Sequence, residues 1–283
     1  MTNETPLPSS ATLPKNRLRR LFKLLLTMTL GFLILSISGV LLYRFVPVPY
    51  TPLMAWKSTI SLFTNGRIGI EKKWVPIEQI ARPMQLAVIK AEDAKFYIHN
   101  GFDFEAIEKA MKYNKTHIKQ KGASTISQQT AKNVFLWPAR SWLRKGMEVY
   151  FTVLIEHLWN KKRILEVYLN VIELGPGVYG VEAASQKYFH KNARNLNPAQ
   201  AALIASVLPN PIKFKINKPT AYILRRQRKI MGRGTITTTA VAKSEIKSKE
   251  TADETKEFFD IKFDSEDEED NGAGSNDPTP ANE

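Results

Sequence analysis

The stretch GASTISQQTAKNVFLW, residues 122–137, places hydroxyl side chains, two adjacent amides, a lysine and an asparagine in one short run. We expect Ser124 to cap a helix that begins in this stretch, because a serine hydroxyl can accept a hydrogen bond from a free N–H of the first turn. Gln128 and Gln129 would then point about 100° apart, so they are expected to face different partners. The stretch has no histidine and no cysteine, so it offers a ligand only hydrogen bonds and the charge of Lys132.

Helical signals also dominate the sequence on both sides of this stretch. Residues 76–97 carry apolar side chains at helical spacing as far as Ile89, and Gly101 is expected to end that helix. Asp103 and Ser141 are placed to cap two further helices. More helical patterns cover residues 161–174, 181–189, 197–209 and 220–231. Few strands are visible and residues 54–75 give no clear pattern, so the predicted fold class is mainly α.

The N-terminal part of the chain has the pattern of a membrane anchor. Five basic residues lie between positions 15 and 23, and no charged residue occurs from Leu24 to Tyr43. As a helix those residues would span about 30 Å, the thickness of the apolar core of a bilayer. A cleaved signal peptide is the alternative, but the apolar run is too long for one and no small-x-small cleavage site follows it. The excess of positive charge before the run predicts a cytoplasmic N-terminus, with the rest of the chain outside.

These patterns predict four parts of the chain. We expect a cytoplasmic segment at 1–20, a transmembrane helix at 21–45, a catalytic domain at 46–232 and an acidic disordered tail at 233–283. The tail is low in core-forming residues and rich in Asp and Glu.

The charge of the chain is divided unevenly. Residues 250–283 hold 13 acidic residues and two lysines, a net −11, which leaves +25 on residues 1–249 given the total of +14. A basic body of that size indicates an anionic partner: nucleic acid, phospholipid headgroups or a phosphorylated substrate. The predicted outward orientation argues against nucleic acid. The absence of cysteine excludes disulfides, thiolate metal sites and cysteine nucleophiles.

Two glutamates are candidates for chemistry. Glu92 lies near the end of an apolar helix, where desolvation would raise its pKa and suit it to proton transfer. The alternative is a structural salt bridge between Glu92 and Lys95. Glu148 follows Arg144 by one helical turn, and the alternative for this pair is an ordinary surface ion pair.

Three cations near Glu148 could hold a diphosphate. Lys132, Arg140 and Arg144 fall within thirteen residues and are interleaved with aromatic and aliphatic side chains. Arginine can bind phosphate oxygens through two parallel hydrogen bonds. The alternative is a solvated helix face. A carboxylate base together with such cations favours glycosyl transfer from a diphosphate-linked donor, because hydrolysis of a sugar–sugar bond would need a protonated acid at the leaving oxygen.

The order of several motifs resembles that of the bacterial peptidoglycan glycosyltransferases of family 51, in their monofunctional biosynthetic form. The resemblance runs from about residue 46 to 231 and rests on EDAKFYIHNGFD, GASTISQQTAKNVF, RKGME and KKRILEVYLN. It implies a lysozyme-like α fold at the outer face of the membrane, where lipid II is polymerised into glycan strands.

The resemblance also implies roles for individual residues. Glu92 would deprotonate the 4-hydroxyl of an acceptor GlcNAc, which attacks C1 of the donor MurNAc with inversion, forms a β-1,4 bond and releases undecaprenyl diphosphate. Glu148 would be a second essential carboxylate near that diphosphate. Lys132, Arg140 and Arg144 would hold the diphosphate. The side chains expected to orient sugar and phosphate oxygens are Ser124, Thr125, Gln128, Gln129 and Asn133.

The remaining expectations concern cofactors, partners and location. No organic cofactor is expected and no metal site is assigned, although a divalent cation, Mg²⁺ or Mn²⁺, could bind beside Glu148. The expected partners are lipid II, the growing glycan strand, membrane lipids and other proteins of cell-wall synthesis, with no nucleic acid. The resemblance to Gram-negative members implies a single-pass protein of the inner membrane with a periplasmic catalytic domain. The rival hypotheses are a lysozyme-like hydrolase and a membrane-anchored scaffold without activity.

Overall fold

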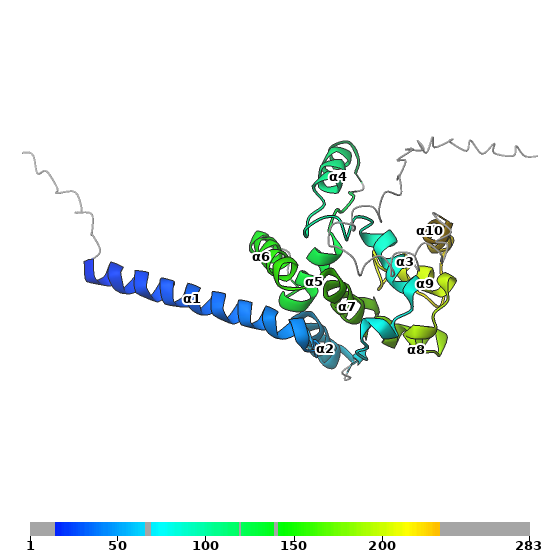
Figure 1. Ribbon diagram of the computed structural model, residues 1–283, viewed down its shortest axis with the longest axis horizontal. Coiled ribbons are helices and arrows are strands. Elements are labelled where there is room, and N and C mark those ends of the chain that lie inside the picture. Colours follow the sequence, from blue (N-terminus) through cyan, green and yellow to red (C-terminus); the bar gives the residue numbers. More distant parts are fainter. Residues whose placement is uncertain (1–14, 66–68, 119, 139–140, 233–283) are drawn as a thin grey trace, which may run out of the picture. The chain divides into compact units, whose positions relative to one another are not determined.

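Helices form most of the fold, as the sequence predicts. The computed structural model describes residues 15–65, 69–118, 120–138 and 141–232, and Figure 1 shows their arrangement. These residues belong to a compact unit that spans Met1–Gly234. The predicted acidic tail at 233–283, the first 14 residues and Arg140 lie outside the described residues.

The predicted membrane helix is present as α1, Lys15–Phe45. Within its segment Arg19–Phe45, an 18-residue window has a mean hydropathy of 2.3 and is only 6% buried, so the helix is long and apolar enough to cross a membrane. The body holds the end of α1 through backbone carbonyls: the indole Nε1 of Trp159 donates to Val40 O at 2.8 Å. The Arg163 guanidinium donates to the carbonyls of Tyr43 and Val46 at 2.8 and 2.6 Å. Since the last four carbonyls of a helix have no partner within it, the bond to Tyr43 satisfies one of the unpaired carbonyls at the C-terminal end of α1.

The body contains nine further α-helices in the described residues. α2 covers Pro52–Asn65, a stretch whose mixed sequence gave no clear prediction. The helix predicted over 76–97 is broken: the 3₁₀ helix η1, Ile77–Gln79, ends at extended residues Ile80 and Ala81, and α3, Arg82–Glu92, begins with a proline in its first turn. The other helices are α4 Phe104–Thr116, α5 Ile126–Phe135, α6 Trp142–Leu158, α7 Lys161–Val171, α8 Val181–Phe189, η2 Ala193–Asn195, α9 Pro198–Val207 and α10 Ala221–Gly232.

Two of the three predicted helix caps are confirmed and the third is wrong by one residue. Asp103 and Ser141 accept hydrogen bonds from the third residue of α4 and α6. α5 is capped by Thr125 instead of Ser124, because only Thr125 has a glutamine three residues later. The Thr125 hydroxyl accepts from the N–H of Gln128, and the Gln128 amide oxygen accepts from the N–H of Thr125.

A small three-stranded sheet joins the chain after α2 to a hairpin after α7. The strands are β1 Glu71–Lys72, β2 Glu173–Gly175 and β3 Val178–Tyr179, in the order β1-β3-β2. β1 and β3 are parallel, and β2 and β3 are antiparallel. Gly180 follows β3 with φ +83°, and a Cβ there would lie 2.7 Å from the carbonyl oxygen of Asn170, so the close return of the chain requires glycine.

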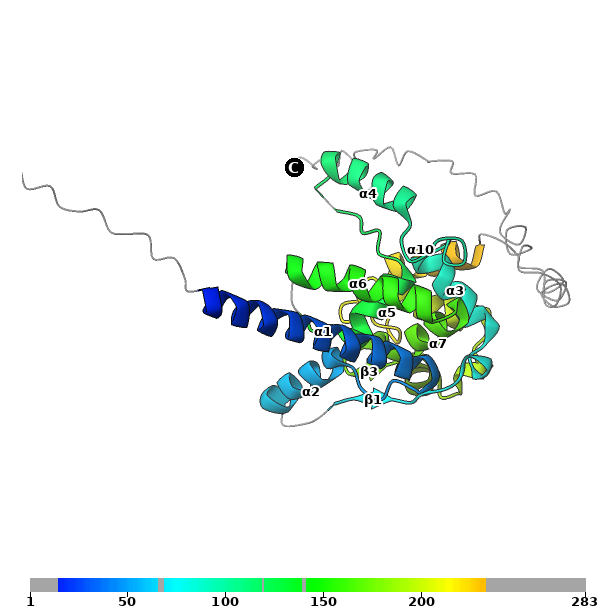
Figure 2. The same cartoon turned by 60° about the vertical axis from the view of Figure 1, so that its left-hand side comes forward.

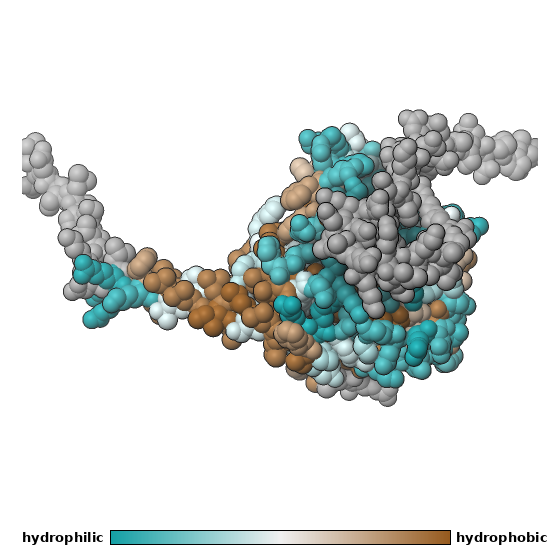
Figure 3. All heavy atoms as spheres, in the orientation of Figure 1, coloured by the Kyte–Doolittle hydropathy of each residue, from teal (hydrophilic) through white to brown (hydrophobic). Residues whose placement is uncertain are grey.

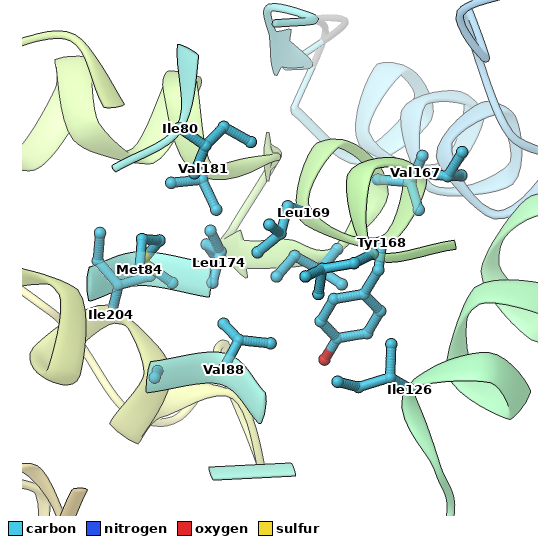
Figure 4. Packing of buried hydrophobic residues seen from close by; sticks show 14 of the residues in the cluster. Ile80, Met84, Val88, Ile126, Val167, Tyr168, Leu169, Leu174, Val181 and Ile204 are labelled. Atoms are coloured by element: carbon cyan, nitrogen blue, oxygen red, sulfur yellow. The ribbon is translucent and has the colours of Figure 1, made fainter. Parts of the chain in front are cut away.

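The core is built around α7, which α5 covers, with α3 and α9 packed together beside it (Figures 1 and 4). Figure 4 shows Tyr168 of α7 pointing toward Ile126 of α5, with Val88 of α3 nearby. Each fully buried aliphatic or aromatic side chain contributes about 1.5–3 kcal/mol. This packing fixes the end of α3 against the start of α5, where the functional side chains meet.

Candidate active site

Glu92 is the last residue of α3, and both of its carboxylate oxygens have a partner. Gln129 Nε2 donates to Glu92 Oε2 at 3.0 Å, and Arg226 Nη2 donates to Glu92 Oε1 at 3.3 Å. Only 13% of the Glu92 side chain is exposed. Burial raises the pKa of Glu92, and Asp93 raises it further, while Gln129, Arg226 and Lys132 act in the opposite direction.

The alternative partner for Glu92 is excluded by the structure. Lys95 forms an ion pair with Glu105 of α4 and not with Glu92. Glu92 is therefore a desolvated carboxylate with a raised pKa, as predicted from its place on an apolar helix.

The amide of Gln129 is held in one orientation by Tyr168. The Tyr168 hydroxyl donates to Gln129 Oε1 at 3.1 Å, which leaves the Gln129 NH₂ group to face Glu92. Tyr168 and Arg226 were not singled out in the sequence. The first lies in the KKRILEVYLN motif, where it could have been noticed, but nothing distinguishes Arg226 from its basic neighbours in RRQRK.

An Asp–His pair ties the end of α3 to the start of α5. His99 Nε2 lies 2.8 Å from Asp93 Oδ1, and the N–H of Ile126 donates to Asp93 Oδ2 at 2.9 Å. The N–H of Gly101 donates to His99 Nδ1 at 3.1 Å, so Nε2 carries the ring proton that points to Asp93. These bonds bring Glu92 and Gln129 to the same place.

Glu148 is a second buried carboxylate, on α6. Only 4% of its side chain is exposed, and its oxygens face Lys145 and the Arg144 guanidinium, the latter at 3.6 Å. The predicted pairing of Arg144 with Glu148 is present, but its interpretation as an ordinary surface pair is wrong because Glu148 is buried. Lys145, its nearer partner, was missed.

The charges of both carboxylates, Glu92 and Glu148, act on Lys132 of α5. Burial lowers the pKa of Lys132, Arg144 and Lys145 lower it further, and Glu148 and Glu92 act in the opposite direction. Among the described residues the Lys132 ammonium has no hydrogen bond and no ion pair within 4 Å. A desolvated cation without a close partner can bind an anionic ligand group.

A pocket of about 330 Å³ opens beside Lys132. It is lined by Gln129, Lys132 and Asn133 of α5, together with Arg144 of α6 and Tyr168 of α7. The Nε of Arg144 is buried and has no hydrogen-bond partner in the described part of the chain. The pocket therefore offers two cations and two amides to a ligand.

The predicted binding residues fall into three groups. Gln129, Lys132, Asn133 and Arg144 line the pocket. Thr125 and Gln128 are buried, and their side chains bond to each other's backbone in the cap of α5, so the two adjacent glutamines do face different partners. Ser124 is exposed, and its carbonyl oxygen accepts from Gln129 Nε2 at 3.4 Å. Arg140 lies outside the described residues, in the gap at 139–140.

The residues around Glu148 do not form a metal cage. Within residues 15–65, 69–118, 120–138 and 141–232 no group of three or more His, Asp or Glu side chains could hold a metal ion. Among these residues both oxygens of Glu148 face cations, Lys145 and Arg144.

Comparison with known proteins gives consistent matches. The sequence profile of the family described as Transglycosylase matches residues 62–235, more than half of the chain. A protein of Bdellovibrio bacteriovorus called biosynthetic peptidoglycan transglycosylase is 58% identical over 255 residues, which cover 90% of this chain and 98% of that protein. A protein of the same name from Pasteurella multocida is 52% identical over 217 residues, 76% of this chain and 85% of that protein. Another from Bacteroides thetaiotaomicron is 53% identical over 196 residues, 69% and 79% of the two chains.

Proposed function

Since the chain belongs to the transglycosylase family and is a peptidoglycan glycosyltransferase that polymerises glycan strands, we propose that it uses lipid II, with Glu92 as the catalytic base. The acceptor is the 4-hydroxyl of a GlcNAc, and the donor is C1 of a MurNAc that carries undecaprenyl diphosphate. The observation that carries this proposal is that the buried Glu92 lies near a pocket lined by the ammonium of Lys132, which has no ion pair with the described residues.

The proposed reaction is a single displacement. Glu92 takes the proton of the acceptor hydroxyl, and the oxygen attacks C1 of the donor from the side opposite to the diphosphate. The C1–O bond to the diphosphate breaks, and its electron pair leaves with the phosphate oxygen. The new bond is β-1,4, and the proton on Glu92 returns to solvent. Desolvation supports this role because it makes the Glu92 carboxylate a stronger base than one in water.

The cations of the pocket suit the leaving group. The diphosphate has a low pKa and needs no proton from a general acid, but its negative charge grows as the bond breaks. Lys132 and Arg144 line the pocket where that charge would develop, so their positive charges can stabilise it. No step of the reaction is assigned to the other residues predicted to bind substrate, which are Arg140, Ser124, Thr125, Gln128 and Asn133. Their contacts with substrate stay predictions, and so does the binding of a divalent cation.

The location of the site beside α1 supports a lipid-linked substrate. The Ser36 hydroxyl of α1 lies 2.7 Å from the hydroxyl of Tyr150 on α6, two residues beyond Glu148. Ser36 is seven residues before Tyr43, so this contact lies about 10 Å inside the outer end of the uncharged run. α6 therefore runs beside the outer part of the span. In this proposal α1 crosses the inner membrane once, with a cytoplasmic N-terminus and a periplasmic catalytic body that meets lipids and other proteins of cell-wall synthesis.

The test compares two substrates for the purified full chain. We expect glycan strands when the chain is incubated with lipid II, and no soluble muropeptides when it is incubated with finished sacculi. Muropeptides from sacculi without strands from lipid II would identify a lysozyme-like hydrolase instead. No product from either substrate would favour a scaffold.

A further inference from the structure

The outer face of α2 is apolar and uncovered. Trp56, Ile60 and Phe63 follow one another at helical spacing and are 56%, 46% and 84% exposed. Residues four and three positions apart lie on one side of a helix, so these three side chains form a continuous apolar stripe. α2 contains no Asp or Glu.

The opposite face of α2 is fixed to the body. Met54 is fully buried, and Lys57 forms an ion pair with Glu173. Leu53, one turn before Trp56 and on the same side of the helix, lines the pocket, and α2 contacts α5. Beyond Leu53 this side is uncovered among the described residues, because Trp56, Ile60 and Phe63 are exposed while Met54 on the other side is buried.

The segment between α1 and α2 is also held, so α2 stays near the outer end of the membrane helix. Lys72 donates hydrogen bonds to the carbonyls of Val48 and Pro49, and its ammonium lies 5.7 Å from the centre of the Trp74 ring. Together with the hydrogen bonds from Arg163 to the carbonyls of Tyr43 and Val46, these bonds hold the connecting segment against the body. Figure 1 places α2 beside the C-terminal end of α1, Figure 2 shows α2 running below the middle of α1, and Figure 3 shows apolar side chains along α1.

We propose that α2 is an interfacial helix whose stripe of Trp56, Ile60 and Phe63 inserts into the outer leaflet of a phospholipid bilayer. The surface is continuous with the span α1, which already lies in the membrane. Tryptophan and phenylalanine on one face of a helix are typical of the boundary between headgroups and acyl chains. The insertion deepens the proposed function, because Leu53 of α2 would then hold one wall of the pocket at the level of lipid headgroups, where a lipid-linked diphosphate resides.

The absence of cysteine from the chain allows a direct test by single-cysteine labelling. Ile60→Cys and Phe63→Cys would each carry a bimane label, in the full chain reconstituted into nanodiscs of phosphatidylethanolamine and phosphatidylglycerol. The matched control is Leu224→Cys on α10, an apolar residue that is 41% exposed and away from α1 and α2. Each label would be exposed to iodide in water and to a doxyl-labelled lipid in the bilayer.

We expect the labels at 60 and 63 to show blue-shifted emission, quenching by the doxyl lipid and loss of iodide quenching, while the label at 224 shows the reverse. Iodide quenching at 60 and 63 equal to that at 224 would overturn the proposal. Protection from both quenchers, with energy transfer between differently labelled chains in one disc, would mean that a second copy covers the stripe and would overturn it as well. These readouts do not depend on turnover, so strand synthesis from lipid II by the wild-type chain tests the proposed function separately.

Discussion

At the scale of the residue, burial raises the pKa of Glu92, while Gln129, Arg226 and Lys132 favour its charged form. Its burial was predictable from the apolar spacing of residues 82–92, but its partners were not, because Gln129, Arg226 and Lys132 come from 37 or more residues later in the chain. The contacts of Arg226 depend on how α10 packs against α3. A contact between residues so far apart in the chain cannot be predicted from the local sequence pattern.

Arg226→Gln should shift the acid limb of the pH–rate profile. Arg226 lowers the pKa of Glu92, so removing its charge raises that pKa, and a higher pH is needed to ionise the base. The acid limb of kcat/KM for strand synthesis should move to higher pH, and Arg226→Lys should restore part of it. Arg225→Gln, an exposed neighbour, is the control. An unshifted limb in Arg226→Gln would show that this guanidinium does not act on the base.

Lys132→Arg should move the basic limb of the same profile. Burial holds the pKa of Lys132 below its ordinary value of 10.5, so in the wild-type chain this ammonium loses its proton at a lower pH than an exposed lysine would. Arginine keeps its charge at all accessible pH values. The variant should be slower but should keep its activity to higher pH, whereas Lys145→Arg should leave the limb in place. A basic limb unchanged by Lys132→Arg would point to a different titrating group.

At the scale of the element, most helices were predicted from periodicity and caps, and the exceptions have physical reasons. α2 was missed because its polar and apolar residues suit a helix that is buried on one side and, as proposed above, faces lipid on the other. The break before α3 was missed because apolar spacing continues across Ile80, although Pro83 lacks the N–H that a continuous helix needs. Ser124 and Thr125 both carry a hydroxyl that could cap α5, but only Thr125 has a glutamine three residues later that can bond back to its N–H.

Thr125→Val should lower stability without touching the chemistry directly. The change removes the cap of α5 and the hydrogen bond that the Thr125 hydroxyl donates to the carbonyl of Gly101 at 2.7 Å. We expect a loss of about 2 kcal/mol in the free energy of unfolding, seen as a lower Tm in detergent. Thr125→Ser keeps both bonds and should stay close to the wild type. Full stability with loss of strand synthesis in Thr125→Val would instead support the predicted contact between Thr125 and substrate.

At the scale of the whole described unit, the membrane helix is part of the catalytic body. Sequence composition was enough to predict a span, but it could not show that Trp159 and Arg163 hold the carbonyls at its end, or that Tyr150 meets Ser36. These contacts join residues more than 110 positions apart. They fix the position of the pocket along the axis of α1.

Arg163→Met should uncouple the span from the body. The variant keeps an unbranched side chain but loses the hydrogen bonds to Tyr43 and Val46 and the ion pair with Glu166. Because Arg163 is mostly buried, we expect a loss of about 2 kcal/mol or more in detergent unfolding. Lys162→Met removes an exposed ion pair with Glu78 and should change stability by less than about 1 kcal/mol. Equal Tm values for the two variants would contradict the role given to Arg163.

The most direct test of the central claim is strand synthesis from lipid II by Glu92→Gln. We expect a loss of about 10²–10⁴-fold in turnover, the contribution of a positioned base. The variant should be at least as stable as the wild type at neutral pH. The raised pKa of Glu92 means that the folded chain binds this proton more tightly than the unfolded chain, so the contribution of Glu92 to stability falls as pH rises from the ordinary value of 4.5 through the raised pKa. Glu105→Gln, at an exposed carboxylate, should keep normal turnover. Wild-type turnover in Glu92→Gln would contradict the account.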